Sequence, residues 1–286
     1  MKQNKIINGK QLSLNIIKKL VKTRTNFLFN PKLVIIKTKK TKEIDIYIKA
    51  KKKISKKLKI KCEIYDFSDN PVKTRIIDVI QKANKDKETL GIIYQFPDSN
   101  KLNSDEIIEK ISPKKDIDGF HKENLERLFL DKAPYHISPT CQSIDYVLRY
   151  LKKNKNVSFE QKICSIISKK SILISSLVKI IIKNFKFLIL IDQNDKNFEK
   201  KLKLGDVVIS CIDKPNFIKD YHIKKGAILI DVGTVWYKNR LQGTVDFNSV
   251  YKKVKYITPV PGGIGPLTVA FLFKNLLVSN MSGYTV

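Results

Sequence analysis

Residues 163–191 read ICSIISKKSILISSLVKIIIKNFKFLILI, and this stretch indicates how the whole chain folds. Two short apolar runs, 163–167 and 187–191, flank a segment long enough for a helix. Buried parallel strands read as continuous apolar runs, so the pattern predicts a strand–helix–strand unit of a parallel sheet. Lysines interrupt the stretch too often for the roughly eighteen uncharged residues that a membrane-spanning helix needs.

The same alternation continues on both sides of this stretch. Further apolar runs predict strands at 33–36, 62–65, 90–94, 207–212 and 227–231. Helices are expected at 44–58, 72–83, 104–111, 143–151, after residue 167 to about 185, and at 266–278. A polar stretch rich in Lys and Asn, 151–157, separates two such series. Short apolar strands alternating with helices are typical of α/β proteins, so we expect two α/β lobes with a cleft between them.

The charge of the chain comes almost entirely from lysine. Its 286 residues hold 56 Lys+Arg and 27 Asp+Glu, a formal net charge of +29, and with five arginines this leaves 56 − 5 = 51 lysines. Proteins that read nucleic acid specifically favour Arg for bidentate contacts, so specific nucleic-acid binding is not expected. A lysine-rich protein that binds RNA or another polyanion stays open as a non-enzymatic alternative, for which binding would weaken steeply with salt.

The cysteines and histidines show no metal-binding spacing. Cys62, Cys141, Cys164 and Cys211 lie far apart without a C-x-x-C pair, and the three histidines form no local pair. This favours buried thiols in a reducing compartment and no metal. The N-terminus has no apolar signal core, so we expect a cytoplasmic protein that does not associate with membranes.

Three segments carry candidate functional residues. The stretch TPVPGGIGPLT, 258–268, concentrates glycine and proline before a helix, which predicts a loop that offers backbone amides to a ligand, or else a structural turn. Tyr47 and Lys51 share one face of the helix expected there, so Lys51 is either a proton-transfer group with a lowered pKa or a solvated lysine. Gln95 and Asp118 follow apolar segments, at positions that resemble strand ends, and each serves either a ligand or a turn.

Together these segments resemble the bifunctional methylenetetrahydrofolate dehydrogenase/methenyltetrahydrofolate cyclohydrolase family. The resemblance runs nearly end to end, and 259–268 differs from the family's P-V-P-G-G-V-G-P-M-T only at Ile264 and Leu267. The other matching stretches are 7–10, 47–51, 91–97, 113–121, 231–233 and 243–247.

The resemblance implies a fold. An N-terminal α/β catalytic and folate-binding domain would span 1–137, with 267–286 packing back on it. A Rossmann-like NAD(P)-binding domain would span 138–266, and folate would lie between the two. The family's members are commonly homodimers, so a homodimer is expected.

The resemblance also implies residue roles. Lys51 would drive the cyclohydrolase proton transfers, Tyr47 would stack on the folate, Gln95 would tune Lys51, and Asp118 would anchor the pterin. The expected folate contacts are Tyr47, Lys51, Tyr94, Gln95, Phe96, Asp118, Pro261, Gly262, Gly263, Ile264, Gly265 and Thr268. The cofactor would be NADP, with NAD possible, and its expected contacts are Ser168, Lys169, Lys170, Gln193 and Thr234.

The sequence departs from the family mainly on the cofactor side. The family's G-R-S-x-x-V-G-x-P loop has lost both glycines and its proline at Ser168, Ile174 and Ser176, and its C-H-S-R-T reads IDQND at 191–195. Asp192 then suits the ribose hydroxyls of NAD, since an acid there disfavours a 2′-phosphate. Two interpretations stay open: an enzyme that performs both reactions, or one that keeps only the cyclohydrolase or a folate-binding function.

Overall fold

The computed structural model describes residues 5–95, 102, 104–169 and 171–278. The chain forms two compact units, each built from two separate stretches. The first unit comprises Leu14–Pro139 and Val269–Val286, and the second comprises Met1–Ser13 and Thr140–Thr268. The chain therefore crosses between the units three times, once at the start of α6 (Pro139–Lys155) and once within each of two further helices, α1 (Gly9–Arg24) and α10 (Ile264–Val278).

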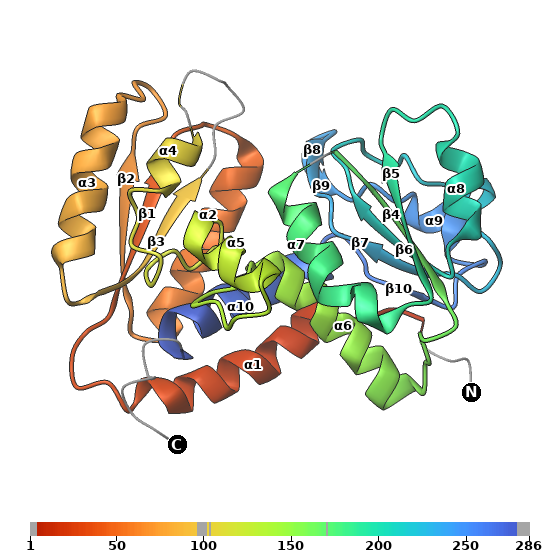
Figure 1. Ribbon diagram of the computed structural model, residues 1–286, viewed down its shortest axis with the longest axis horizontal. Coiled ribbons are helices and arrows are strands. Elements are labelled where there is room, and N and C mark those ends of the chain that lie inside the picture. Colours follow the sequence, from red (N-terminus) through yellow and green to blue (C-terminus); the bar gives the residue numbers. More distant parts are fainter. Residues whose placement is uncertain (1–4, 96–101, 103, 170, 279–286) are drawn as a thin grey trace. The chain divides into compact units, whose positions relative to one another are not determined.

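The first unit is built on a three-stranded parallel sheet of order β2-β1-β3 (Figure 1). Its strands are β1 (Lys32–Lys37), β2 (Lys61–Asp66) and β3 (Thr89–Gln95). Its helices besides those two are α2 (Lys42–Lys57), α3 (Lys73–Lys85), α4 (Ser104–Ile108) and α5 (Lys122–Phe129). Parallel strands need crossover connections, which α2 and α3 provide.

Both faces of this sheet are buried. Leu33 and Ile35 of β1 face one apolar cluster, while the alternate residues Val34 and Ile36 face another. The first cluster also contains the apolar face of α10, and the second contains apolar residues of α3 and α4. This explains why β1 reads as an uninterrupted apolar run. The expected return of the C-terminal helix to the first lobe is confirmed.

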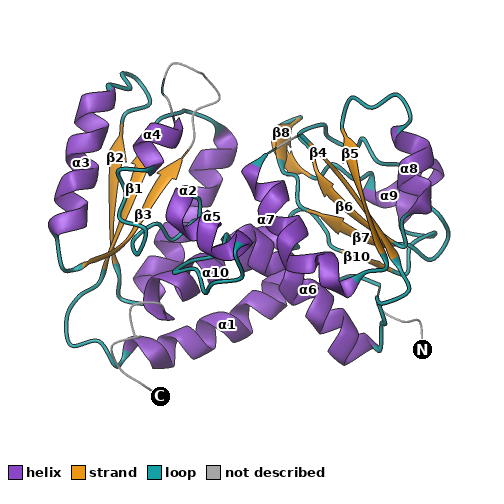
Figure 2. Cartoon of the chain, viewed as in Figure 1, coloured by secondary structure: helices purple, strands orange, loops and turns teal. Residues whose placement is uncertain are grey.

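The second unit carries a five-stranded parallel sheet of order β10-β7-β6-β4-β5, seen among helices in Figure 2. Its strands are β4 (Ile163–Ser168), β5 (Phe187–Asp192), β6 (Val207–Cys211), β7 (Ile228–Asp231) and β10 (Tyr256–Ile257). The chain leaves β4 toward β5 on one side and then crosses back to β6 on the other side. Such a reversal opens a ligand crevice at the carboxyl ends of the strands.

Helices and a hairpin complete the second unit. The helices are α6 (Pro139–Lys155), α7 (Ile172–Ile181), α8 (Phe198–Leu204) and α9 (Phe247–Val250), with 3₁₀ turns η1 (Ile182–Asn184) and η2 (Asp220–His222). Strands β8 (Val235–Tyr237) and β9 (Arg240–Gln242) pair around Lys238 and Asn239, which both have positive φ. Over the described residues, no helix combines the length and apolarity needed to cross a bilayer.

The N-terminal segment differs from the expected domain boundary. Residues 1–137 were expected to form one domain, yet the segment before Leu14 groups with the second unit. The N–H of Ile7 donates to the carbonyl of Ile257 at 2.8 Å, and the N–H of Ile257 donates to Lys5 at 2.9 Å. The physical reason is that β10 is an edge strand, whose free N–H and C=O groups accept the N-terminal segment as a partner.

Candidate active and cofactor sites

Helix α2 positions Lys51 and Tyr47 on its buried side. The helix begins at an N-cap, Thr41, whose hydroxyl accepts the Ile44 N–H at 3.3 Å. Tyr47 packs against the apolar cluster that contains Ile48, and Lys51 is 6% exposed. The neighbouring Lys52 and Lys53 are exposed. Lys51 is thus set apart from the lysines around it by burial, which excludes the alternative of a solvated lysine that the sequence had left open.

Asp118 lies in a tightly bonded turn. The buried carboxylate of Asp116 accepts the N–H groups of Gly119 at 3.2 Å and His121 at 2.7 Å, which fixes the chain on both sides of Asp118. Gly119 has φ +72°, and a Cβ there would come within 2.8 Å of the Ser138 N, so only glycine suits this position. From α10, the Asn275 amide donates to the Ile117 carbonyl at 2.8 Å. The turn is therefore held by side chains as well as by backbone.

Lys51 and Asp118 influence each other's protonation. Burial lowers the pKa of Lys51, and the negative charge of Asp118 opposes that shift. Burial raises the pKa of Asp118 to about 6, and the charge of Lys51 opposes it. Cys62 of β2 also lies near Lys51, and burial raises the pKa of its thiol, which favours the neutral form. Burial thus favours the neutral form of both side chains, unlike those of a solvated lysine and aspartate.

The residues at the end of β3 divide between two faces of the sheet. Gln95 is the last residue of the strand and is partly exposed, and its carbonyl accepts the Thr38 hydroxyl at 2.8 Å. Tyr94, 3% exposed, packs in the apolar cluster of α3, whereas Tyr47 packs in the cluster of the opposite face. The structure thus does not bring Tyr94 together with Tyr47, because successive strand side chains alternate. Phe96 lies outside the described residues.

The glycine-rich segment 258–268 belongs to the second unit and forms a compact loop before α10. The Val260–Pro261 peptide is cis and Gly262 has φ +108°. A Cβ on Gly263 would lie 2.5 Å from the Pro259 carbonyl oxygen. Ile264 is buried, while Gly265 is partly exposed, and the Thr268 hydroxyl donates to the Ile264 carbonyl at 3.3 Å. Glycine is thus needed for close backbone packing here, and Pro261, which is exposed, stands at the surface of the loop.

Two sequence motifs of the second unit meet at a buried carboxylate. Asp231, at the end of β7, accepts the Thr244 hydroxyl at 2.7 Å and the Val245 N–H at 3.0 Å. A Cβ on Gly243 would lie 2.1 Å from the Asp231 Oδ2. Burial raises the pKa of Asp231 to about 7. The segments 231–233 and 243–247 therefore form one structural unit, and the sequence alone did not indicate that they meet.

At the carboxyl edge of β4 and β5, three predicted cofactor positions lie close together. Ser168 and Asp192 are register partners, and the Gln193 N–H donates to the Ser168 carbonyl at 3.1 Å. Lys169 follows Ser168 directly. Gln193 is 8% exposed, and its Oε1 has no hydrogen-bond partner among the described residues. An orphaned buried acceptor at a strand end is consistent with a ligand that donates to it.

The remaining cofactor positions differ in their surroundings. Lys169 forms an ion pair with Asp213, which follows β6, at 2.5 Å, and both side chains are exposed. The contact between Asp213 and Lys169 was not predicted from the sequence. Thr234 follows β7, two strands away from β4. Lys170 lies outside the described residues.

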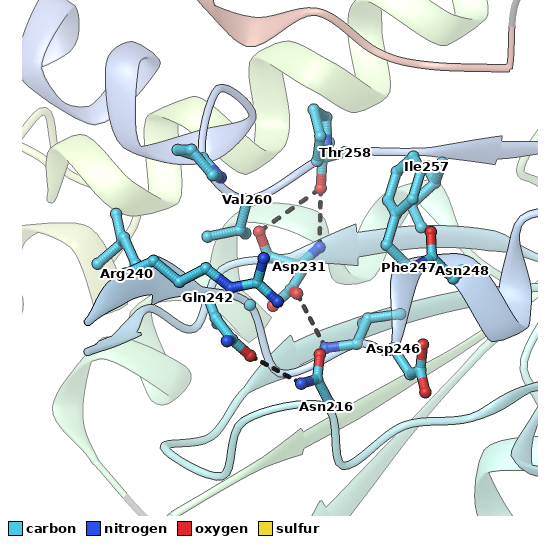
Figure 3. A pocket seen from close by; sticks show the side chains of 15 residues that line it. Asn216, Asp231, Arg240, Gln242, Asp246, Phe247, Asn248, Ile257, Thr258 and Val260 are labelled. Atoms are coloured by element: carbon cyan, nitrogen blue, oxygen red, sulfur yellow. Dashed lines mark hydrogen bonds between the residues drawn. The ribbon is translucent and has the colours of Figure 1, made fainter. Parts of the chain in front are cut away.

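The second unit also contains a polar cavity of about 410 Å³ that the sequence did not predict (Figure 3). Arg240, Asn216 and Gln242 line it, and the Asn216 amide donates to the Gln242 Oε1 at 2.7 Å. The loop residues Val260 and Pro261 form part of its wall. No sequence motif signals such a cavity, because its wall combines four segments that are remote along the chain. The described residues contain no group of three or more His, Cys, Asp or Glu side chains placed to hold a metal.

A doubly wound parallel sheet in one unit and a buried lysine with a lowered pKa in the other define an α/β enzyme with a dinucleotide-binding unit. The chain belongs to the tetrahydrofolate dehydrogenase/cyclohydrolase family. The sequence model of the family's catalytic domain matches residues 7–118, and that of its NAD(P)-binding domain matches 140–282. The resemblance predicted from the sequence motifs is thereby confirmed.

Individual relatives agree with this assignment along the whole chain. A Thermodesulfovibrio yellowstonii protein named Bifunctional protein FolD is 33% identical over 276 residues, which is 95% of each chain. A protein of the same name from Staphylococcus epidermidis is 30% identical and covers 96% of each chain. The crystal structure of a bifunctional FolD methylenetetrahydrofolate dehydrogenase/cyclohydrolase from Campylobacter jejuni superposes with a TM-score of 0.87 at 27% identity, covering 97% of this chain and 99% of that one.

Proposed function

We propose that this protein interconverts methylenetetrahydrofolate, methenyltetrahydrofolate and 10-formyltetrahydrofolate in one-carbon metabolism, as an NAD(P)-dependent dehydrogenase and a cyclohydrolase. The observation that carries the proposal is the buried Lys51, whose pKa is lowered beside Asp118. Family membership supplies the substrate class. The relatives named Bifunctional protein FolD share 95% and 96% of their length with this chain.

In the cyclohydrolase step, neutral Lys51 acts as the general base. It removes a proton from water as the water oxygen bonds to the methenyl carbon. The ammonium of Lys51 then returns this proton to folate N5 while the bond from N5 to that carbon breaks. The hydroxyl proton leaves to solvent as the C=O of the formyl group forms on N10. One water is consumed and one proton is released, so the step balances.

Other residues of the first unit bind and orient the substrate. The Asp118 carboxylate accepts hydrogen bonds from the amino edge of the pterin, and its charge keeps the pKa of Lys51 from falling further. The ring of Tyr47, on the same helix face as Lys51, stacks on the folate. Gln95, at the end of β3, is a further proposed contact of the folate, and so is Phe96, which lies outside the described residues. In the second unit, the backbone of Pro261 to Gly265 and the Thr268 hydroxyl contribute contacts to the folate.

The residues at the carboxyl edge of β4 and β5 fit a nicotinamide dinucleotide. The orphaned Gln193 Oε1, the reversal of strand order at β4 and the exposed carboxylate of Asp192 support this fit. Ser168, Lys169, Lys170 and Gln193 would hold its phosphates and adenosine, with Thr234 nearer the nicotinamide. When bound, the nicotinamide supplies the hydride acceptor for oxidation of methylenetetrahydrofolate.

The test of the proposal is the variant Lys51→Met. Removal of a general base costs about 10²–10⁴-fold in rate, so hydrolysis of methenyltetrahydrofolate, followed by its absorbance, should fall by at least a hundredfold. The matched control is Lys53→Met, which removes an exposed lysine of the same helix and should leave the rate unchanged. Circular dichroism checks that both variants fold. Normal hydrolysis in Lys51→Met would refute the role of this lysine.

We also propose that the protein is a cytoplasmic homodimer. The family resemblance supports the dimer, and four free cysteines, two of them buried, are consistent with a reducing compartment. Sedimentation velocity should give twice the 33.0 kDa of one chain. A species of one chain at micromolar concentration would contradict the dimer.

A further inference from the structure

We infer that Asp192 makes this protein select NAD over NADP, a conclusion that rests on the proposed function and concerns the nucleotide it uses. The two dinucleotides differ only at the adenosine ribose, where NADP carries a 2′-phosphate. Selection between them is therefore decided by the groups that the protein places around that ribose.

The position of Asp192 follows from the sheet. β4 and β5 are adjacent parallel strands whose last residues, Ser168 and Asp192, are register partners at the carboxyl edge. β4 lies at the reversal of strand order, where dinucleotides cross such sheets, and β5 is the strand that follows it in the chain. An acidic side chain at the end of this second strand is the group that bonds the ribose hydroxyls in dinucleotide-binding sheets.

The Asp192 carboxylate is held in place and exposed. Its Oδ1 accepts the N–H of Asn194 at 2.9 Å, which closes a turn directly after the strand. The next residue, Gln193, is fixed to Ser168 through its own N–H. These bonds orient the end of β5, and within the described part of the chain Oδ2 accepts no hydrogen bond. That oxygen is therefore available to the 2′- and 3′-hydroxyls of NAD, whereas a 2′-phosphate would meet a like charge.

Two of the lysines near this edge already pair with carboxylates, and no arginine occurs in the two segments that form it. The acidic Asp195 lies in the same connection, although Lys201 pairs with it at 2.5 Å. Lys169 has a carboxylate partner in Asp213. Lys196 is exposed further along the connection to α8. None of the five arginines occurs in the segments 168–176 and 191–197. The guanidinium group, which binds a phosphate in bidentate fashion, is therefore missing from both segments.

Direct binding measurements test this inference without depending on turnover. Titration calorimetry of the intact protein with NAD and with NADP, without folate, should give a Kd for NADP at least about tenfold higher than that for NAD. Asp192→Asn keeps the shape of the side chain and removes its charge. This variant should weaken the binding of NAD by roughly tenfold, since hydrogen bonds to charged groups are the strong ones. It should also tighten the binding of NADP.

A matched control and a second readout keep the test interpretable. Asp195→Asn neutralises the neighbouring acid, and the ratio of the two Kd values should stay within about twofold of the original protein. Thermal unfolding with each nucleotide gives the same ranking, because a bound ligand stabilises the fold according to its Kd.

The possible failures are distinguishable. If NADP binds as tightly as NAD, or if Asp192→Asn leaves the ratio unchanged, the inference is overturned while the proposed enzyme stands. If neither nucleotide binds at millimolar concentration, the dehydrogenase half of the proposed function falls together with the inference. The Lys51→Met experiment then still decides the cyclohydrolase half independently.

Discussion

The two units of this protein keep their family's residues to very different degrees. In the first unit, Tyr47, Lys51, Gln95 and Asp118 all match the family, and burial lowers the pKa of Lys51 and raises that of Asp118. In the second unit, the glycines of the dinucleotide loop are gone and an ion pair links the ends of two strands. A general base must have one identity at one place, whereas phosphates can be bound by many arrangements of amides and cations.

The largest expected effect tests whether the first unit depends on its last helix. Phe273 of α10 is fully buried in the cluster that contains Leu33 and Ile35. Phe273→Ala should lower the free energy of unfolding by about 3–5 kcal/mol, through lost burial and the cavity left behind. Methenyl hydrolysis should be lost on warming before dinucleotide binding is. Denaturant unfolding measures the first effect, and the neighbouring Lys274→Ala, at an exposed side chain, is the control. A loss below about 1 kcal/mol would contradict the packing described.

A second prediction concerns the pH dependence of the first unit. The pKa of Asp118 is about 6 in the folded protein, against an ordinary value of 3.8, so the folded chain holds this proton more tightly than the unfolded chain. The associated stability is complete below pH 3.8 and is lost as the pH rises through 6. Asp118→Asn removes the dependence. A pKa difference of about 2 corresponds to roughly 3 kcal/mol in the free energy of unfolding. Because Asp118 is partly exposed, we expect a change of about 1 kcal/mol.

This prediction is measured by urea unfolding at pH 4 and pH 7.5. The stability of Asp118→Asn relative to the original protein should improve toward the higher pH. Asp69→Asn, which alters an exposed ion pair with Lys40, should show no such trend. A relative stability of Asp118→Asn that is flat with pH would show that Asp118 has an ordinary pKa.

The smallest expected effect concerns the ion pair between Lys169 and Asp213 in the second unit. Asp213→Asn releases Lys169 from its ion pair, so a dinucleotide phosphate no longer competes with a carboxylate. Affinity for NAD should rise by about 3–10-fold, a gain of roughly 1 kcal/mol. Stability should change by less than about 1 kcal/mol, because the pair is exposed. In a Lys169→Met background the gain should disappear. A gain that persists there would mean that Asp213 repels the phosphate directly.

The apolar runs predicted strands β1 to β7, whereas the short strands β8, β9 and β10 and several helix ends were not predicted. The apolar runs at 33–36 and 163–167 lie within β1 and β4, because strands buried on both faces leave little choice of residue. The helix expected at 104–111 ends at Ile108, and the one expected to reach 185 ends at Ile181 with a 3₁₀ turn after it. Helix ends depend on local capping and packing that periodicity does not show.

For the candidate sites, too, the sequence predicted some features and missed others. The spacing of Tyr47 and Lys51 left open whether Lys51 is buried or solvated, and the structure shows it buried. Tyr94 is a core residue on the opposite face of the sheet. Its expected contact with folate was carried over from the family motif, without regard to the alternation of side chains along the strand. The Lys169–Asp213 contact joins residues 44 positions apart, and only the three-dimensional sheet brings them together. The roles assigned to individual folate and cofactor contacts remain predictions until the variants are made.

The C-terminal helix has a consequence for how the protein is made. Asn275 donates to the carbonyls of Ile117 and Ile137, so the segment that carries Asp118 is bonded to a residue near the end of the chain. On the ribosome, the first unit must therefore wait, with part of its sheet uncovered, while the whole second unit is synthesised. We expect nascent chains that stop before residue 269 to bind chaperones and to be cut by proteases within β1 to β3. The turn that carries Asp118 is therefore expected to reach its final form only after α10 has been translated.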